Sequence, residues 1–242
     1  MDAPEDFGLD PAARAALESV STATITTVLL KEGLRNVWMR GPRPLRLGQK
    51  RVAGPAFTLR FVPAREDLAT PASWASPIST RAAIEAMPEG AVAVIDTMGV
   101  TDAGVFGDLL CARMAMRHVA ALVTDGVLRD AVGVDQTGLP VWSAGVAAPP
   151  SVAGLTFVGW NEPVGCGGVA VFPNDVVVAD GDGAVVVPRA LLPRVLAEAP
   201  EQERMEAWIM REIGRGVPLP GLYPMNEATR ARYAAQAKDD RS

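Results

Sequence analysis

The stretch Gly104-Val105-Phe106-Gly107-Asp108-Leu109-Leu110 is a glycine-containing turn that runs directly into an apolar, helix-forming segment. Twenty residues separate Asp108 from the pair Arg129-Asp130, which ends the stretch Leu122-Val123-Thr124-Asp125-Gly126-Val127-Leu128-Arg129-Asp130. This second stretch is typical of a short apolar strand followed by a glycine turn. Both stretches follow a strand–turn–helix pattern, and ligands of such sheets bind at the carboxyl ends of the strands. We therefore expect the two stretches to form one small-molecule site.

The two halves of this predicted site offer different chemistry. A helix start has unpaired backbone N–H groups and a positive dipole end, which suit a carboxylate. Gly107 would let a ligand approach the backbone closely. An arginine beside an aspartate offers an electrophile and a ligand for a hard cation. Plainer interpretations stay open, because Asp108 could be an ordinary helix cap and Arg129-Asp130 a surface ion pair.

The composition bounds the class of protein. The chain has 242 residues, 49% of them hydrophobic, which is enough to bury a sizeable core in one large domain or two small ones. A net charge of −5 without a basic stripe argues against nucleic-acid binding. No apolar run reaches the length of a membrane span, and the acidic start Met1-Asp2-Ala3-Pro4-Glu5-Asp6 is unlike a leader. We expect a cytoplasmic protein that binds neither nucleic acid nor membrane.

The scarce residues exclude several mechanisms. The single histidine, His118, rules out zinc sites built on several histidines, and we expect it to be partly buried at a helix end. None of the three lysines lies in an apolar setting that suits a Schiff base. The two cysteines make neither a disulfide framework nor a cysteine-based zinc cluster, and Cys111 is expected in the core.

Hydrophobic periodicity and capping residues predict the secondary structure. Helices are expected at 11–20, 21–31, 79–87, 107–119 and 189–213, and strands at 51–61, 91–95, 120–124, 140–144, 169–172, 176–179 and 184–187. Gly54-Pro55 should break the first strand, and the helix at 107–119, apolar on most of its surface, should be buried. We expect a polar loop at 63–77, a hairpin turn at 180–183, a backbone-packing role for the glycine cluster 165–168, and a tail after Gly214 that wraps a neighbour or frays. The order of elements indicates an α/β or α+β domain with a mixed sheet.

At this point the chain resembles a known family. Asp108, twenty intervening residues and Arg129-Asp130 resemble the signature of the RraA-like proteins and 4-hydroxy-4-methyl-2-oxoglutarate aldolases. The segments 54–58 and 173–180 resemble further parts of that family, and the resemblance extends from about residue 15 to 205. It implies an α/β fold of the swivelling β/β/α sandwich type, as a single domain with a C-terminal helix and tail. We place the RraA-like domain at 1–215 and the tail at 216–242. The resemblance also implies a homotrimer or a homohexamer built from two trimers.

The resemblance further implies roles for individual residues. The backbone amides of Gly107, Asp108, Leu109 and Leu110 would hold the carboxylate of a pyruvate unit, and Arg129 would contact the substrate. Asp130 would bind a divalent metal, Mg²⁺ or Mn²⁺, and Asp108 would act through metal-bound water.

A glutamate from a neighbouring subunit's late helix is also expected from the resemblance, with Glu203 and Glu206 as candidates. Two positions depart from the family pattern. Gly133 stands where an acidic residue is frequent, and Asn174 where glycine is usual.

These roles imply a metal-dependent aldolase that does not use a Schiff base. It would cleave a 4-hydroxy-2-oxo acid, such as 4-hydroxy-4-methyl-2-oxoglutarate, to pyruvate. Oxaloacetate decarboxylation is expected as a side activity because it passes through the same enolate. Two alternatives stay open: a non-catalytic regulator that binds a ribonuclease, and a metal-dependent lyase or hydratase that acts on another 2-oxo or sugar acid. The joint presence of Asp108, Arg129 and Asp130 argues against the regulator.

Overall fold

Strand β2 (Val52–Pro63) organises the fold because it pairs with three other strands along its length. In the computed structural model, which describes residues 7–239, its start pairs antiparallel with β9 (Val176–Asp180), its middle pairs parallel with β3 (Val92–Asp96), and its end pairs antiparallel with β8 (Leu155–Trp160). The expected break at Gly54-Pro55 is wrong. A Cβ on Gly54 would lie 2.6 Å from the Gly90 carbonyl oxygen, so glycine lets β2 approach its neighbour without interruption.

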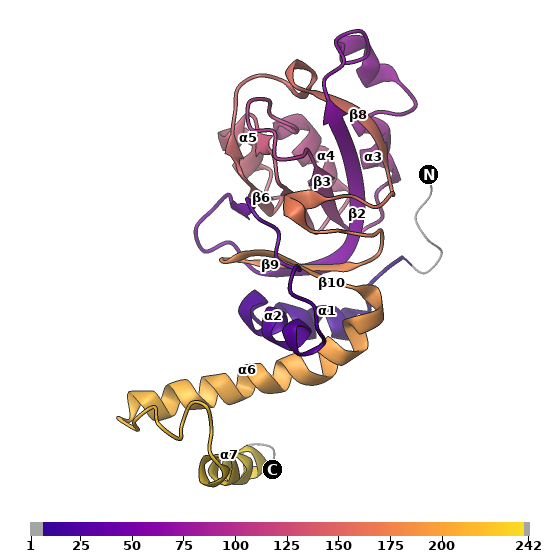
Figure 1. The fold of residues 1–242 in the computed structure, drawn as a ribbon. Coiled ribbons are helices and arrows are strands. Elements are labelled where there is room, and N and C mark those ends of the chain that lie inside the picture. The colour runs from indigo at the N-terminus through magenta and orange to yellow at the C-terminus, as the bar shows by residue number, and fades with distance from the viewer. Residues whose placement is uncertain (1–6, 240–242) are drawn as a thin grey trace.

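The main sheet is mixed and nearly closes on itself (Figure 1). Its strand order is β1-β6-β4-β3-β2-β9-β10, with β8 on the far part of β2. The remaining strands of this order are β1 (Arg43–Pro44), β4 (Ala121–Thr124), β6 (Val141–Ser143) and β10 (Gly183–Val187). The segment 38–44 approaches both edges, since Trp38 forms a bridge with Val185 of β10 while β1 pairs with β6. This architecture confirms the expected α/β class with a mixed sheet.

The curved sheet encloses one of the buried clusters. Trp142 lies fully buried there, and its indole N–H donates to the Asp180 carbonyl oxygen at 2.7 Å. The hairpin turn expected at 180–183 is confirmed, because β9 and β10 are antiparallel with Asp180 opposite Gly183. The expected strand at 169–172 forms only the bridge between Val164 and Val171.

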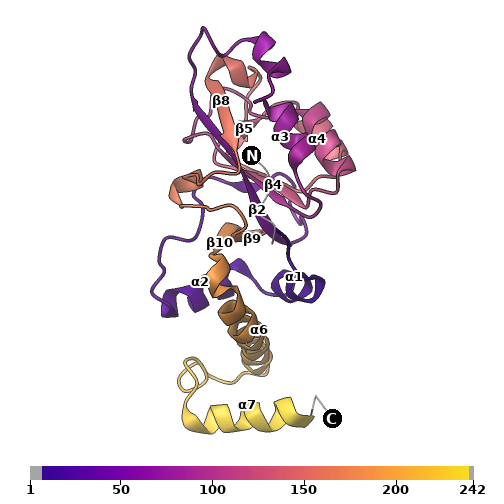
Figure 2. The ribbon, with the colours of Figure 1, turned by 90° about the vertical axis from the view of Figure 1, so that its right-hand side faces the viewer.

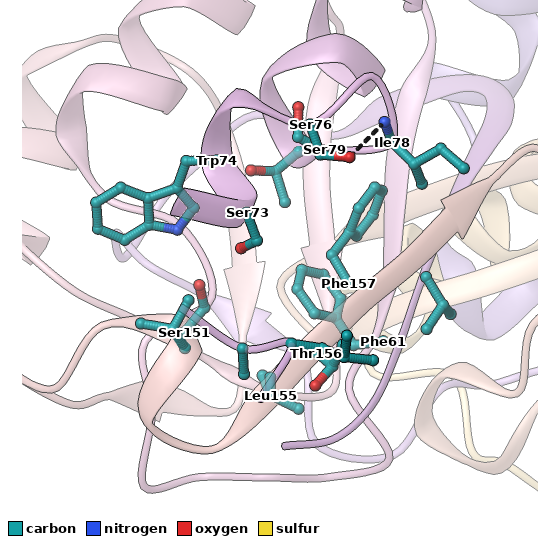
Figure 3. Close-up of a pocket in the computed structure, with 15 residues that line it drawn as sticks. Phe61, Ser73, Trp74, Ser76, Ile78, Ser79, Ser151, Leu155, Thr156 and Phe157 are labelled. Atoms are coloured by element: carbon teal, nitrogen blue, oxygen red, sulfur yellow. Dashed lines mark hydrogen bonds between the residues drawn. The ribbon is translucent and has the colours of Figure 1, made fainter. Parts of the chain in front are cut away.

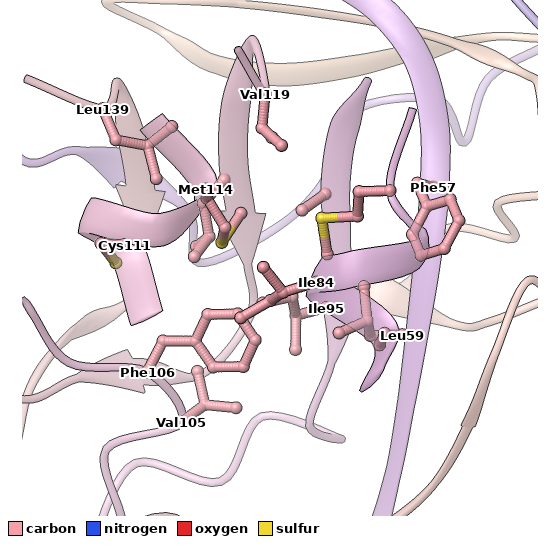
Figure 4. Close-up of a cluster of buried hydrophobic side chains, with 14 of the residues drawn as sticks. Phe57, Leu59, Ile84, Ile95, Val105, Phe106, Cys111, Met114, Val119 and Leu139 are labelled. Carbon is pink, nitrogen blue, oxygen red and sulfur yellow. The ribbon is translucent and has the colours of Figure 1, made fainter. Parts of the chain in front are cut away.

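A second buried cluster lies beneath the helices α3 (Thr80–Ala86), α4 (Asp108–Met116) and α5 (Ala131–Gln136), and Figure 4 shows how its side chains interlock. Cys111 and Met114 of α4 point into it, which confirms Cys111 as a core residue. The expectation that α4 is buried holds only for this inner face, because Leu109 is 81% exposed and Met116 73%. His118, expected to be partly buried, is exposed just beyond the helix.

Helices α1 (Pro11–Glu18), α2 (Thr22–Lys31) and α6 (Leu192–Gly214) cover the outer face of the β9–β10 hairpin (Figure 1). The expected caps are in place, since Asp10 and Ser21 accept N–H groups of the first turns of α1 and α2. The buried Asp180 carboxylate accepts both the N–H and the hydroxyl of Thr22, at 2.8 and 2.7 Å. These bonds fasten α2 to the hairpin.

The second half of α6 extends away from the sheet and carries the C-terminal segment (Figure 2). This segment was expected to wrap a neighbour or fray; it contains helix α7 (Glu227–Asp239), which contradicts fraying there, while contact with a neighbour stays a prediction. Trp208 and Ile209 of α6 pack with Leu222 in a small cluster of their own, and Trp208 stacks edge-on against Tyr233 of α7 at 5.6 Å. The placement of a domain boundary at residue 215 stays a prediction.

Two further short strands and four 3-10 segments complete the described structure: β5 (Val127–Leu128), β7 (Gly145–Val146), η1 (Pro71–Ala75), η2 (Ser151–Ala153), η3 (Cys166–Gly168) and η4 (Arg189–Leu191). Within residues 7–239, no helix combines the length and the apolar character needed to cross a bilayer. The acidic start, residues 1–6, from which we expected no leader, lies outside the described residues.

Candidate active site

The first half of the candidate site is the start of α4. Gly107 occupies the cap position and has no side chain to occupy the helix amides, so Asp108 is the first helical residue rather than the cap. The Asp108 carboxylate accepts the N–H of the next residue, Leu109, at 2.7 Å. The first N–H groups of a helix lack carbonyl partners within it. The α4 start therefore offers donors to an anion, and Asp108 already engages one of them.

The second half is the segment between β5 and α5. The Arg129 N–H donates to the Phe106 carbonyl oxygen at 3.0 Å, which ties this segment to the turn before α4. Asp130 has a left-handed backbone with φ of 54° and precedes the first turn of α5. The Arg129 Nε lies 3.0 Å from the Asp130 Oδ2, with the two side chains 38% and 45% exposed. The ion pair that sequence analysis left open as an alternative is therefore present, and it faces solvent.

Three glycines allow the two halves to touch. A Cβ on Gly107 would lie 2.8 Å from the Asp130 Oδ2, and one on Gly104 would lie 2.7 Å from the Arg129 Cβ. A Cβ on Gly133 would lie 2.8 Å from both Cβ and Oδ2 of Asp108. At distances this short, a side chain at any of these positions would force a neighbouring group to move. The structure thus brings Asp108, Arg129 and Asp130 together, while their chemical roles stay predictions.

The site opens into a cavity of about 220 Å³. Its walls include the predicted residues of both halves, together with side chains from α3, η1 and η2: Trp74, Thr80, Arg81 and Ser151. Arg81 is a second cation that the sequence analysis missed, and its guanidinium lies 4.8 Å from the centre of the Trp74 ring. Only the fold brings Arg81 here, since no local pattern links residue 81 to the motif at 107–130.

The carboxylates of Asp108 and Asp130 fit a hard divalent cation. Mg²⁺ is usually held by one or two carboxylates and completes its shell with water and substrate oxygens. The Asp130 side chain is 45% exposed and lines the open cavity, so a cation and its waters can reach its carboxylate from that side. The described residues contain no group of three or more His, Cys, Asp or Glu side chains arranged around an ion. Two carboxylates at an open cavity are a donor set of the kind that a magnesium site with several bound waters uses.

Cys111 lies one helical turn after Asp108 but has no place in the chemistry. Burial, and secondarily the negative charge of Asp108, raises the pKa of the Cys111 thiol to about 12. A thiol with so high a pKa supplies almost no thiolate at neutral pH, and the thiolate is the nucleophile.

The two candidate glutamates for a neighbouring subunit are both engaged within their own chain. Glu203 accepts hydrogen bonds from the Ser21 N–H and hydroxyl and from the Thr24 hydroxyl, at 3.2, 3.1 and 2.6 Å. It therefore helps to cap α2. Glu206 accepts one hydrogen bond, from Gln202 at 2.7 Å. A contribution of either residue to another subunit's site stays a prediction.

The two departures from the family pattern have physical explanations. Gly133 is required because Asp108 packs directly against it, which leaves no room for an acidic side chain. Asn174 has φ of 70°, in the left-handed region where asparagine is the best-tolerated substitute for glycine. Its N–H donates to the Ala56 carbonyl oxygen at 2.9 Å, so the turn before β9 keeps its bond to β2.

Comparison with known proteins agrees with this geometry. The RraA-like family model, described as Aldolase/RraA, matches residues 22–186, and the chain belongs to this family. The crystal structure of Streptomyces coelicolor RraAS2, described as an unusual member of the RNase ES inhibitor RraA protein family, is 35% identical with a TM-score of 0.74, covering 86% of this chain and 98% of that one. An uncharacterized protein from Pseudomonas syringae has a TM-score of 0.76 at 25% identity, covering 89% and 98%.

Some relatives found by sequence are named for an activity, and others are not. A Halalkalibacterium halodurans protein named "Putative 4-hydroxy-4-methyl-2-oxoglutarate aldolase" is 31% identical, over 63% of this chain and 67% of its own length. Protein DlpA of Legionella pneumophila is 29% identical over 73% of this chain, but the match spans only 28% of that protein.

The contact between Gly133 and Asp108 generates the first prediction. Gly133→Ala should lower kcat for the expected aldol cleavage by about 10–100-fold, the loss typical of disturbing a group that supports a metal site. The added methyl must displace the Asp108 carboxylate, whereas alanine suits helix α5 better than glycine does. Steady-state kinetics should therefore show the loss while the melting temperature stays close to that of the wild type.

The matched control is Gln136→Ala, at an exposed position of the same helix, which should leave kcat and the melting temperature unchanged. Normal turnover in Gly133→Ala would mean that the placement of Asp108 is irrelevant to activity.

Proposed function

We propose that this protein is a divalent-metal-dependent aldolase that cleaves 4-hydroxy-2-oxo acids, such as 4-hydroxy-4-methyl-2-oxoglutarate, to pyruvate. The observation that carries the proposal is the contact between the α4 start and the Arg129-Asp130 pair at an open cavity. This arrangement combines donors for a carboxylate, a guanidinium for a keto oxygen and carboxylates for a hard cation. The names of relatives such as the Halalkalibacterium halodurans protein support the same reaction class.

The substrate's reacting end would bind by its charge and its oxygens. The N–H groups at the start of α4 receive the carboxylate, where the helix dipole also favours a negative charge. The Arg129 guanidinium donates to the keto oxygen. A divalent cation held by Asp130, with Asp108 nearby, would add Lewis-acid stabilisation of the negative charge on that oxygen.

Cleavage then needs one proton removed and one added. Asp108 orients the water that takes the proton from the C4 hydroxyl, and the C4–O bond becomes a carbonyl as the C3–C4 bond breaks. The electron pair of that bond moves into the enolate of pyruvate, whose oxygen Arg129 stabilises. Protonation at C3 gives pyruvate, and the remaining fragment leaves as an aldehyde or ketone. Loss of CO₂ from oxaloacetate gives the same enolate, so decarboxylation is the expected side activity.

A regulatory role is the second candidate. It is favoured by the likeness to RraAS2, which is described as a member of a family of RNase ES inhibitors. The regulator alternative does not need the open cavity or the charged residues at its wall. Pyruvate release therefore separates the two.

The test of the proposal is pyruvate release from a panel of 2-oxo acids with and without Mg²⁺. We expect release from at least one 4-hydroxy-2-oxo acid and from oxaloacetate, loss of activity after EDTA treatment, and recovery with Mg²⁺ or Mn²⁺. The reason is that the described donor set provides carboxylates for a hard, exchangeable cation. EDTA-treated protein with full turnover would remove the metal from the proposal, and no release from any compound would favour the regulator.

The role assigned to Arg129 gives a sharper prediction. Arg129→Lys should lower kcat for oxaloacetate by about 10²–10³-fold, the usual effect of losing one oxyanion donor. A planar guanidinium can contact the keto oxygen and a second acceptor together, whereas an ammonium is a point charge with different geometry. Oxalate, which presents similar oxygens, should also bind more weakly. Steady-state kinetics measure the change in kcat, and oxalate inhibition measures the change in affinity. The control is Arg35→Lys, a position outside the described cavity walls, and near-normal kcat and oxalate affinity in Arg129→Lys would take Arg129 out of the site.

We also propose that the chain assembles as a homotrimer or homohexamer. Large apolar side chains are exposed on α4 and α5 beside the site, with Leu109 81%, Val132 76% and Met116 73% exposed. A subunit interface would remove these apolar side chains from water, which favours association. Light scattering at micromolar concentration should give three or six times the mass of one chain, and a monomer would contradict the proposal.

A further inference from the structure

A second cavity adjoins the candidate active site. It has a volume of about 340 Å³ and lies between the loop around η1 and strand β8. Trp74, Thr80 and Ser151 line both cavities, so the two share a wall. Figure 3 shows Trp74 and Ser151 toward one side of this space and Ile78 toward the other, with Phe61 and Phe157 between. A ligand that binds by its carboxylate at the α4 start would therefore have this second space beside its far end.

The walls of the second cavity are uncharged and largely apolar, with serine and threonine hydroxyls among them. Of the described residues, fifteen line it, and none of them carries a charge. Phe61, Leu155 and Phe157 form its floor from β2 and β8, while Leu68 and Ile78, each about half exposed, stand at its rim. Exposed apolar groups that surround a hollow are a common feature of ligand sites.

Four of the hydroxyl groups in this wall, those of Ser73, Ser76, Ser79 and Thr156, are hydrogen-bonded to nearby backbone groups. The Ser73 hydroxyl donates to the Thr70 carbonyl oxygen at 2.6 Å. The hydroxyl oxygens of Ser76, Ser79 and Thr156 each accept a backbone N–H, at 3.1, 3.2 and 2.9 Å. A carboxylate placed in this cavity would lose its hydration without gaining a cation, which is costly.

The cations that lie elsewhere around Trp74 are engaged as well. Arg113 donates two hydrogen bonds to the Glu85 carboxylate, both at 2.8 Å, and Arg81 lies over the Trp74 ring. A substrate with a second carboxylate would have to draw one of these guanidinium groups away from its partner. An apolar group would need no such rearrangement.

We propose that the substrate of this protein is a 2-oxo acid whose far end is apolar, either aromatic or branched aliphatic, and that this end occupies the second cavity. The inference rests on the proposed function for the position of the reacting end, and it replaces a second carboxylate with an apolar group as the preferred tail. Burial of a ring-sized group contributes about ten- to a hundredfold in affinity. Val158, which lines the cavity and is 39% exposed, then determines the specificity for the tail.

The test compares binding of phenylpyruvate and 2-oxoglutarate, measured by calorimetry in the presence of Mg²⁺. These probes share the 2-oxo acid end and differ in whether the tail is a ring or a carboxylate. We expect the wild type to bind phenylpyruvate at least about tenfold more tightly. Val158→Arg places a cation in the apolar wall, so it should lower phenylpyruvate affinity, raise 2-oxoglutarate affinity and reverse the preference.

The matched control is Ile213→Arg, a β-branched residue of α6 with 38% exposure that lies outside both cavities, which should keep the wild-type preference. Equal binding of the probes, tighter binding of 2-oxoglutarate, or an unchanged preference in Val158→Arg would overturn the inference. Because binding needs no turnover, the two failures can be told apart. Pyruvate release without a preference for the ring would contradict only the proposed apolar tail. A preference for the ring without pyruvate release would contradict only the proposed aldolase activity.

Discussion

The buried carboxylate of Asp125 holds together the two chain segments from which the candidate site is built. It follows strand β4 and accepts the N–H and hydroxyl of Thr97, after strand β3, at 2.9 and 3.0 Å. It also accepts the N–H groups of Gly99 and Gly167, both at 3.1 Å. A charge with 7% exposure is tolerated only when such donors replace its water. One side chain therefore fixes the segments that follow the carboxyl ends of two neighbouring parallel strands, β3 and β4.

The segments that follow β3 and β4 lead to the two halves of the site. The chain leaves β3 through Thr97 toward the α4 start, and it leaves β4 through Gly126 toward Arg129. A Cβ on Gly126 would lie 2.4 Å from the Thr97 hydroxyl oxygen, so the two segments are in direct contact. Gly167 is equally constrained, since a Cβ there would lie 2.7 Å from the Arg40 backbone, which supports the expected packing role of the 165–168 cluster. The site is thus placed by close backbone contacts rather than by an interaction between its functional side chains.

Sequence reasoning succeeded where the signal is local. Helix caps at Asp10, Ser21 and Ser79 and the turn at 180–183 depend on residues a few positions apart, and the structure confirms them. The motif of Asp108 and Arg129-Asp130 could also be read locally, because each half has its own strand–turn–helix pattern.

The failures arise where distant segments decide the outcome. Strand β8 was missed because its pairing with the end of β2 joins residues about a hundred positions apart in the chain. The same holds for Trp74 and Arg81, which reach the site from a loop and helix with no motif of their own. Helix α4 was expected to be buried because periodicity reports apolar faces, not what covers them. In our proposal, a further copy of the chain covers the exposed Leu109 and Met116 of this helix.

In our proposal, Asp130, Arg129 and the α4 start form one site for a metal and a 2-oxo acid. The most direct test of this proposal is a crystal structure with Mn²⁺ and oxalate, in which anomalous scattering locates the metal. We predict a metal peak at about 2–2.2 Å from an Asp130 carboxylate oxygen, with oxalate between the metal, Arg129 and the first amides of α4. A metal and oxalate bound elsewhere, with Asp130 paired to Arg129 as before, would contradict the account.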